Sequence, residues 1–226
     1  MGFIEIARGK MSDYNEDRIC PDQYVGDITV TSNNITLPAS NDNDNDFETR
    51  ENLSTFSRNN PLIILILESP HIDEYAQNTP RPAAGNRINK TGKAIRKMFN
   101  YIISSYNDYT IPSGTYSLII MNAIQYQCSL GKKPSKFRND VFLECWVDFG
   151  KQDFINRFFS IYQNNDIIIN ACTKGTDRPY TYLRDLVEEE IINLGYNSHI
   201  KLQHPCRWRK IYNTAIKNKI PQNYNW

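Results

Sequence analysis

The chain has 226 residues, a formal net charge of +1 and five cysteines. No apolar run approaches the roughly 20 residues that cross a bilayer, and residues 1–10 lack the basic-then-apolar profile of a signal peptide. An odd number of widely spaced cysteines argues against a disulfide framework. We therefore expect a cytoplasmic monomer without a membrane partner, built as one well-cored domain with an appendage.

Charge divides the chain near residue 60. Residues 1–60 carry 5 basic and 11 acidic side chains, whereas residues 61–226 carry 21 basic and 14 acidic ones. An acidic segment ahead of a basic body is compatible with a body that binds a polyanion. We expect residues 1–60 to be an acidic arm or linker, partly disordered, with a short strand pair within residues 24–37 and a solvated linker at 41–46, NDNDND.

Residues 62–67, LIILIL, predict a strand that is buried on both faces of a sheet. Pro70 cannot continue a central strand, so the chain leaves the sheet after Glu68 and Ser69. The polar residues that follow lie at the carboxyl end of the strand, where open α/β sheets bind ligands. A basic helix then begins at Thr91-Gly92 and covers residues 93–104.

The rest of the body alternates strands with helices. Buried strands are predicted at 116–124, 166–170 and 198–203, and helices at 153–162, 180–194 and 208–217. Such alternation predicts parallel strands joined by right-handed crossovers. We expect an α/β fold over residues 61–226, a three-layer α/β/α domain around a central, mainly parallel four-stranded sheet.

Four polar residues stand at the carboxyl ends of the predicted strands. They are Glu68, Asn122, Asn170 and His204. Because parallel strands end at one edge of a sheet, a carboxylate, an amide and an imidazole that are distant in sequence should meet there.

Most of residues 61–215 resembles the uracil-DNA glycosylase superfamily. In that superfamily an apolar strand precedes a turn of the form Gly-(Gln/Glu)-X-Pro, and here the turn reads Leu67-Glu68-Ser69-Pro70-His71. The iron–sulfur branch is the most similar, with the turn Gly-Glu-Ala-Pro-Gly, acidic residues soon after it and a segment like Gly-Arg-Ala-Gly before a helix. The similar features here are Asp73, Glu74 and residues 89–92, NKTG.

The later motifs of the superfamily have counterparts as well. Residues 118–124, LIIMNAI, are similar to the strand whose terminal Asn reads the base, which implies that role for Asn122. Residues 204–208, HPCRW, resemble the His-Pro-Ser or His-Pro-Ala motif and the DNA-probing loop that follows it.

The residue types suit cleavage of an N-glycosidic bond. Glu68 would stabilise the positive charge that develops on the sugar and position water, and His204 would donate a hydrogen bond to the leaving base. Asn122, with a donor and an acceptor, would read the edge of a flipped base in a pocket formed with Ser69, Pro70 and His71.

Basic and aromatic residues are the expected contacts to DNA. Arg207 and Trp208 are candidates for the wedge that enters the duplex, and Arg209 follows them. Further cations expected to track phosphates are Arg87, Lys90 and Lys93, with a basic loop at 131–138. The alternatives are that Trp208 is a core residue of the closing helix, that Asn122 caps a strand end, that His204 is a loop hydrogen-bonder, and that the basic helix face is merely solvated.

The sequence also departs from the family pattern. Leu67 and His71 stand where the iron–sulfur branch has glycine, which should reshape the base pocket. Cys128 and Cys145 match two of its four cluster cysteines, but Cys20 stands alone in place of a Cys-X-X-Cys pair. We expect no iron–sulfur cluster, no other cofactor and no metal, with these cysteines serving as small buried hydrophobes.

The expected activity is that of a monofunctional DNA glycosylase acting on uracil or a modified base, in repair or in defence against foreign DNA. No lysine occupies a motif position from which it could attack as an amine, which favours water. The alternatives are a non-catalytic DNA-binding member of the same fold and a hydrolase of free nucleosides or nucleotides.

Overall fold

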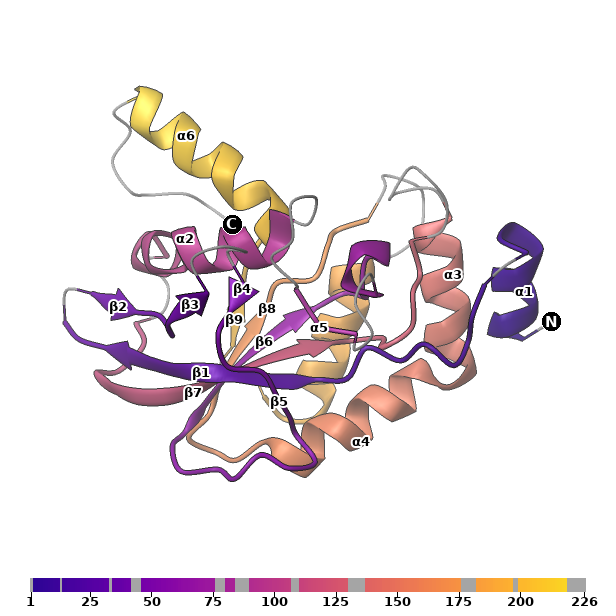
Figure 1. The fold of residues 1–226 in the computed structure, drawn as a ribbon, viewed down its shortest axis with the longest axis horizontal. Helices are drawn as coiled ribbons and strands as arrows, with labels where there is room; N and C mark the ends of the chain where they lie inside the picture. Colours follow the sequence, from indigo (N-terminus) through magenta and orange to yellow (C-terminus); the bar gives the residue numbers. More distant parts are fainter. Residues whose placement is uncertain are drawn as a thin grey trace.

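The computed structural model describes residues 2–12, 14–32, 34–41, 46–75, 80–83, 90–106, 110–129, 137–175, 182–196 and 199–218. Within them the chain forms a mixed α/β fold around a curled mixed sheet (Figure 1). No helix in these ranges is both long and apolar enough to cross a bilayer.

Strand β6 (Leu62–Leu67) lies at the centre of the sheet, with all six side chains buried. It pairs in parallel with β7 (Gly114–Asn122) on one side and β8 (Ile167–Asn170) on the other, and β8 pairs in parallel with β9 (Ile200–Lys201). The four predicted parallel strands are therefore present, although β7 begins and ends two residues before the predicted range. Their unbroken aliphatic runs are explained by apolar cores on both faces.

Part of the first 60 residues belongs to this sheet, which differs from the expectation of an acidic arm or linker. Strand β1 (Gln23–Val30) runs antiparallel to β7 and buries Val25 and Ile28 completely (Figure 1). The predicted strand pair is confirmed as β1 with β2 (Ile35–Thr36), and β5 (Glu51–Asn52) also pairs with β1. The sheet is thus larger and more mixed than predicted, because β1 covers the edge that β7 would otherwise leave unpaired.

Two smaller elements complete the N-terminal part. Helix α1 (Phe3–Lys10) buries Phe3 in the core, and strands β3 (Ser40–Asn41) and β4 (Asp46–Phe47) form a separate pair. The middle of the predicted 41–46 linker lies outside the described residues.

Helices contribute to both cores. One core joins alternate side chains of β6 to α2 (Lys90–Ser104) and α6 (Trp208–Asn218), through residues that include Ile63, Leu65, Phe99, Ile102 and Trp208. The other joins the remaining β6 side chains to α3 (Arg138–Cys145), α4 (Lys151–Ile161) and α5 (Leu183–Asn193), through residues that include Ile64, Ile66, Phe142, Phe154 and Val187.

The four predicted helices are confirmed with small shifts at their ends. Gly195 has a φ of +91° just after α5, which is the left-handed conformation expected of a glycine that ends a helix. Helix α3 was not predicted. It continues through a π-helical turn (Trp146–Gly150) into α4, and residues 138–150 lack the clear helical periodicity of the other helices.

Candidate functional site

The parallel register of β6 and β7 places Glu68 next to the end of the strand that carries Asn122. Leu67 is the register partner of Asn122. The ladder then continues past both strands, because Ala123 N donates to Leu67 O at 2.7 Å and Ile124 N donates to Glu68 O at 3.0 Å. Glu68 is thereby fixed one residue beyond the end of β6, beside the end of β7.

Glu68 is a buried carboxyl group, with the residue only 4 % exposed. Its Oε1 accepts a hydrogen bond from Ser69 Oγ at 2.9 Å and lies 3.6 Å from Arg138 Nε at the start of α3. Burial raises the pKa of Glu68, while the Arg138 charge and the Ser69 hydrogen bond oppose that rise. From sequence Arg138 is only the last cation of a basic loop, and nothing in its spacing indicates the contact with Glu68.

His204 lies in the turn between β9 and a 3-10 turn (Pro205–Arg207), where its Nδ1 accepts a hydrogen bond from Cys206 N at 3.3 Å. Burial, followed by the charges of Arg138, Arg207 and His71, lowers the pKa of His204 to about 3. The ring is therefore neutral at ordinary pH, and since Nδ1 is an acceptor, the proton sits on Nε2. A neutral imidazole with a protonated Nε2 can donate to a carbonyl oxygen without carrying charge.

Asn122 is 1 % exposed, and neither its Nδ2 nor its Oδ1 has a hydrogen-bond partner among the residues that the structure describes. Buried polar groups are almost always hydrogen-bonded, and an unpaired one lowers stability. The alternative that the Asn122 side chain caps the strand end is wrong, because that side chain makes no such bond. Its amide is available to a partner from outside the protein.

The backbone of Asn122 is held by a buried ion pair that sequence reasoning missed. Asp22 Oδ1 accepts from Asn122 N at 3.2 Å, and Asp22 Oδ2 pairs with Arg157 Nη1 at 2.5 Å. Arg157 Nη2 also donates to the carbonyl oxygens of Asn122 and Ala123, both at 3.1 Å. Asp22 lies within the acidic first 60 residues, so that segment helps to position the site.

The carboxylate and the amide approach the edge from opposite faces of the sheet. Asn122 shares a face with Leu67, its register partner, on the side of α2. Glu68 instead lies among Arg138, Cys128 and Cys172 on the side of α3. Burial raises the pKa of both thiols, and the charge of Glu68 adds to that rise. A base that contacts both groups would have to lie across the strand ends.

The other predicted base-pocket residues lie in the same turn. Pro70 is buried, His71 is half-buried, and the charge of His71 contributes to the lowered pKa of His204. A 3-10 turn (Ile72–Tyr75) follows them.

The predicted DNA-contacting residues differ in their exposure. Lys93, Arg207 and Arg209 are exposed. Trp208 is 0 % exposed, donates from Nε1 to Gln203 O at 2.6 Å and packs near Phe99. This placement corrects the prediction of a DNA wedge at Trp208, because its ring is part of the core that α6 forms with α2. Arg87 and the side chain of Lys90 lie outside what the structure describes.

The cysteines that match the cluster positions, Cys20, Cys128 and Cys145, are buried and free. Burial raises the pKa of each thiol, which favours the neutral form over the thiolate that a metal needs. Among the described residues, no group of three or more His, Cys, Asp or Glu side chains is arranged to hold a metal ion. The absence of an iron–sulfur cluster stays a prediction.

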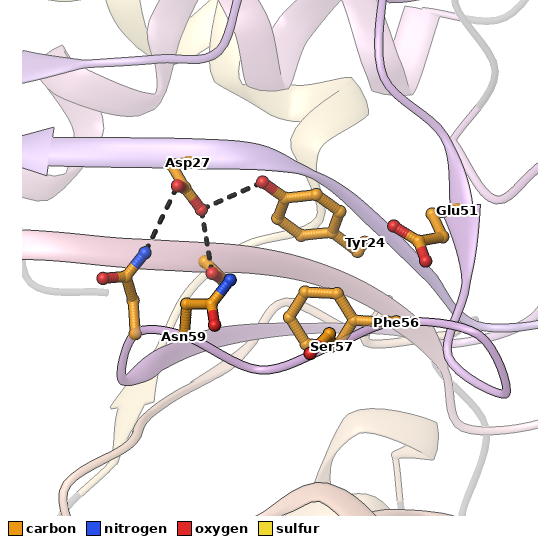
Figure 2. A pocket seen from close by; sticks show the side chains of 8 residues that line it. Tyr24, Asp27, Glu51, Phe56, Ser57 and Asn59 are labelled. Atoms are coloured by element: carbon orange, nitrogen blue, oxygen red, sulfur yellow. Dashed lines mark hydrogen bonds between the residues drawn. The ribbon is translucent and has the colours of Figure 1, made fainter.

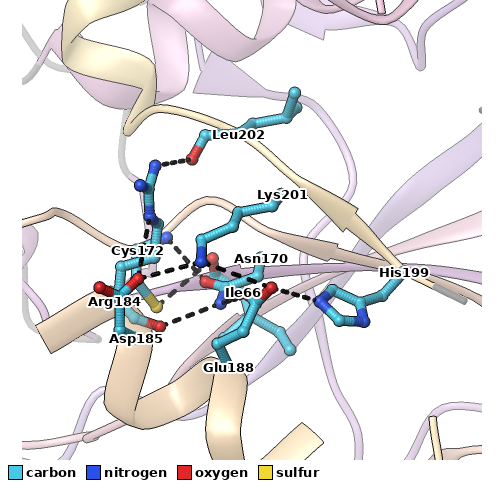
Figure 3. Close-up of polar contacts among 9 residues, drawn as sticks. All are labelled: Ile66, Asn170, Cys172, Arg184, Asp185, Glu188, His199, Lys201 and Leu202. Atoms are coloured by element: carbon cyan, nitrogen blue, oxygen red, sulfur yellow. Dashed lines mark hydrogen bonds and ion pairs between the residues drawn. The ribbon is translucent and has the colours of Figure 1, made fainter. Parts of the chain in front are cut away.

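Asn170, the remaining strand-end residue, belongs to a separate hydrogen-bond network (Figure 3). Its Nδ2 donates to Glu188 Oε2 at 2.7 Å and to Arg184 O at 3.2 Å, and its Oδ1 accepts from Cys172 N at 3.2 Å. Glu188 also contacts His199 Nε2 at 2.7 Å. The Asn170 amide is fully engaged in the fold and is not free to bind a ligand.

A hollow of about 230 Å³ lies away from these residues (Figure 2). Tyr24, stacked on Phe56, forms part of its lining together with Asp27. Asp27 already accepts hydrogen bonds from Tyr24, Asn60 and Ser117. None of the predicted site residues lines this hollow.

No protein-family model, curated protein or solved structure matches the chain.

Proposed function

We propose that the protein is a monofunctional DNA glycosylase of the uracil-DNA glycosylase superfamily, with the three-layer α/β/α architecture implied by its alternating strands and helices. It would hydrolyse the N-glycosidic bond of uracil or a modified base flipped out of DNA, in base-excision repair or in defence against foreign DNA. The observation that carries this proposal is the buried Asn122 amide without a partner, at the same strand edge as Glu68 and His204.

An unpaired buried amide is best explained by a ligand that completes its hydrogen bonds. A nucleobase edge presents a donor beside an acceptor, which an Asn side chain matches with its own acceptor and donor. The hydrogen bonds of Asp22 and Arg157 to the backbone of Asn122 would fix the position of the side-chain amide and leave its own donor and acceptor unused.

In the proposed reaction, water attacks C1′ of the deoxyribose as the bond from C1′ to the base nitrogen breaks. The bonding electron pair leaves with the base, and positive charge develops on the sugar. The Glu68 carboxylate stabilises that charge, positions the water and accepts its proton. Nε2–H of His204 donates to a carbonyl oxygen of the departing base as negative charge builds there. The products are a free base and an abasic site.

DNA would be attracted by the exposed cations of α2 and of the segment around the start of α6. Lys93 and Lys97 are exposed on α2, and Arg207 and Arg209 are exposed near His204. Such phosphate contacts make affinity fall with increasing salt. Arg207, which directly precedes the buried Trp208, is the remaining candidate for a residue that enters the duplex.

The test is release of free base from DNAs that carry uracil, hypoxanthine, or hydroxymethylated or glucosylated cytosine, scored as free base and as alkali-labile sites. We expect release from at least one of them, lost in His204→Ala. Salt-sensitive DNA binding without release from any substrate would favour the non-catalytic alternative. Release from free nucleosides that is insensitive to salt would favour the nucleoside hydrolase.

A further inference from the structure

Arg138 has a half-buried side chain whose guanidinium keeps unused hydrogen-bond donors. Its side chain is 16 % exposed, and its Nε is buried without a hydrogen-bond acceptor. The nearest carboxylate oxygen, Glu68 Oε1, is 3.6 Å from Nε, which is too long for a hydrogen bond. Across the part of the chain that the structure describes, the guanidinium makes this one ion pair and donates no hydrogen bond.

This state of an arginine calls for an explanation. A guanidinium has five N–H donors in a fixed fork, and buried arginines normally spend them on carboxylates, phosphates or carbonyl oxygens. Arg157 in the same protein does so, with bonds to Asp22, Asp153 and two backbone carbonyl oxygens. The charge of Arg138 is therefore balanced in part by Glu68, while its N–H donors remain available to a ligand.

The surroundings of Arg138 favour an anion rather than a neutral ligand. It is the first residue of α3, a helix start with no side-chain cap, where backbone N–H groups add positive potential. After burial, the charges of Arg138 and of the exposed Arg207 both lower the pKa of His204. The anion would enter a region where the positive charges of two arginines act on a neutral imidazole.

We propose that Arg138 forms an anion subsite that takes a backbone phosphate of the flipped nucleotide, while its Nε side keeps the Glu68 carboxylate aimed at the sugar. A phosphate is the group of DNA that carries charge before the reaction begins, and it accepts two parallel N–H bonds from a guanidinium. Arg138 is thus a substrate-binding residue that also acts as a positioning residue through Glu68. The inference depends on the proposed function for the identity of the phosphate, but binding of a phosphate ion to Arg138 does not.

The first experiment uses inorganic phosphate as the probe and thermal unfolding as the readout. At constant ionic strength, replacing chloride by phosphate should raise the midpoint temperature of the wild-type protein, because a ligand that binds the folded state stabilises it. The shift should disappear in Arg138→Gln, shrink in Arg138→Lys, which keeps the charge without the fork, and persist in the control Lys151→Gln, at an exposed lysine of α4. A wild-type midpoint that does not respond to phosphate, or an equal response in Arg138→Gln, overturns the subsite.

The second experiment uses the substrate on which the wild type releases base. Arg138→Gln should raise the Kd for DNA about 10- to 100-fold, as expected for loss of charge-assisted hydrogen bonds, and reduce the salt dependence of binding by about one phosphate contact. It should also move the acid limb of the kcat/KM profile to higher pH, since Glu68 would lose the charge that favours its ionised form. A purely structural residue would not move that limb.

The experiments distinguish failure of the anion subsite from failure of the glycosylase proposal. A phosphate response lost in Arg138→Gln, without base release from any DNA, supports the anion subsite and refutes the glycosylase. Base release with unchanged Kd and pH profile in Arg138→Gln supports the glycosylase and overturns the subsite.

Discussion

Replacing Asn122 with leucine should make the protein more stable and inactive at once. The amide of Asn122 is buried, and in the described part of the chain neither of its polar atoms has a hydrogen-bond partner, so the folded state carries the desolvation of a donor and an acceptor without compensation. A buried polar group left unpaired costs about 1–3 kcal/mol. Leucine has a similar shape and no polar atoms. We therefore expect Asn122→Leu to raise the free energy of unfolding by about 1–3 kcal/mol.

Asn170 provides the matched control, because it is the same residue at the same end of a neighbouring parallel strand. Its amide makes three hydrogen bonds, to Glu188, Arg184 and Cys172. Asn170→Leu would break all three and leave a carboxylate oxygen without a donor, so we expect a loss of about 3–5 kcal/mol. The two variants should move stability in opposite directions.

The assay is urea unfolding followed by circular dichroism, with base release measured on the same preparations. The Asn122→Leu protein should have a higher midpoint at an unchanged slope and release base at least about 100-fold more slowly, because the base edge loses its hydrogen bonds. A destabilisation of about 2 kcal/mol or more would refute the reasoning, since it would show that the amide supports the fold.

Three further predictions concern the frame around the site. Asp22→Ala should lower the free energy of unfolding by about 3 kcal/mol in the same urea assay, because it leaves Arg157 without its buried partner. A loss under about 0.5 kcal/mol would contradict a stabilising role of the Asp22–Arg157 ion pair. The hydrogen bond to Glu188 raises the pKa of His199, so its stabilisation is fully present below pH about 6.5 and is lost as pH rises through the raised value. Unfolding measured between pH 6 and 9 should show this loss, and His199→Gln should flatten it. His204 should contribute no step to the pH profile of kcat/KM near pH about 6.5, because its pKa is about 3 and the ring stays neutral. A step there that is present in the wild type and absent in His204→Asn would contradict this.

The central strands were predictable because their signal is local and strong. The run from Leu62 to Leu67 can satisfy six buried positions only as a strand covered on both faces, and Pro70 fixes where that strand must end. From those ends the sequence places Glu68 and His204 at one edge of the sheet, and that they act on one substrate stays a prediction. The contact of Arg138 with Glu68 could not be predicted, because no spacing rule reveals that the last cation of a basic loop will start a helix beside that carboxylate.

The role of the first 60 residues could not be predicted from composition. Their acidic character suggested an arm, yet β1 buries Val25, Ile28 and Val30 in the core, with a register shift between Tyr24 and Asp27, and shields the edge of β7. Strand pairing over about 90 residues of sequence is a tertiary effect that local propensity does not report. The same holds for Trp208, whose position after His-Pro suggested a wedge, whereas packing against Phe99 made it part of the core.

The most direct test of the account is single-turnover base release by Glu68→Gln. Glutamine keeps the size of the side chain and removes only the charge that would stabilise the sugar cation and accept the proton of water. Glu51→Gln, the same change on β5 away from the site, is the control. We predict release at least about 100-fold slower in Glu68→Gln, as for loss of one electrostatic group of an active site, and unchanged in Glu51→Gln. Equal rates for wild type and Glu68→Gln would contradict the assignment of the strand edge as the catalytic site.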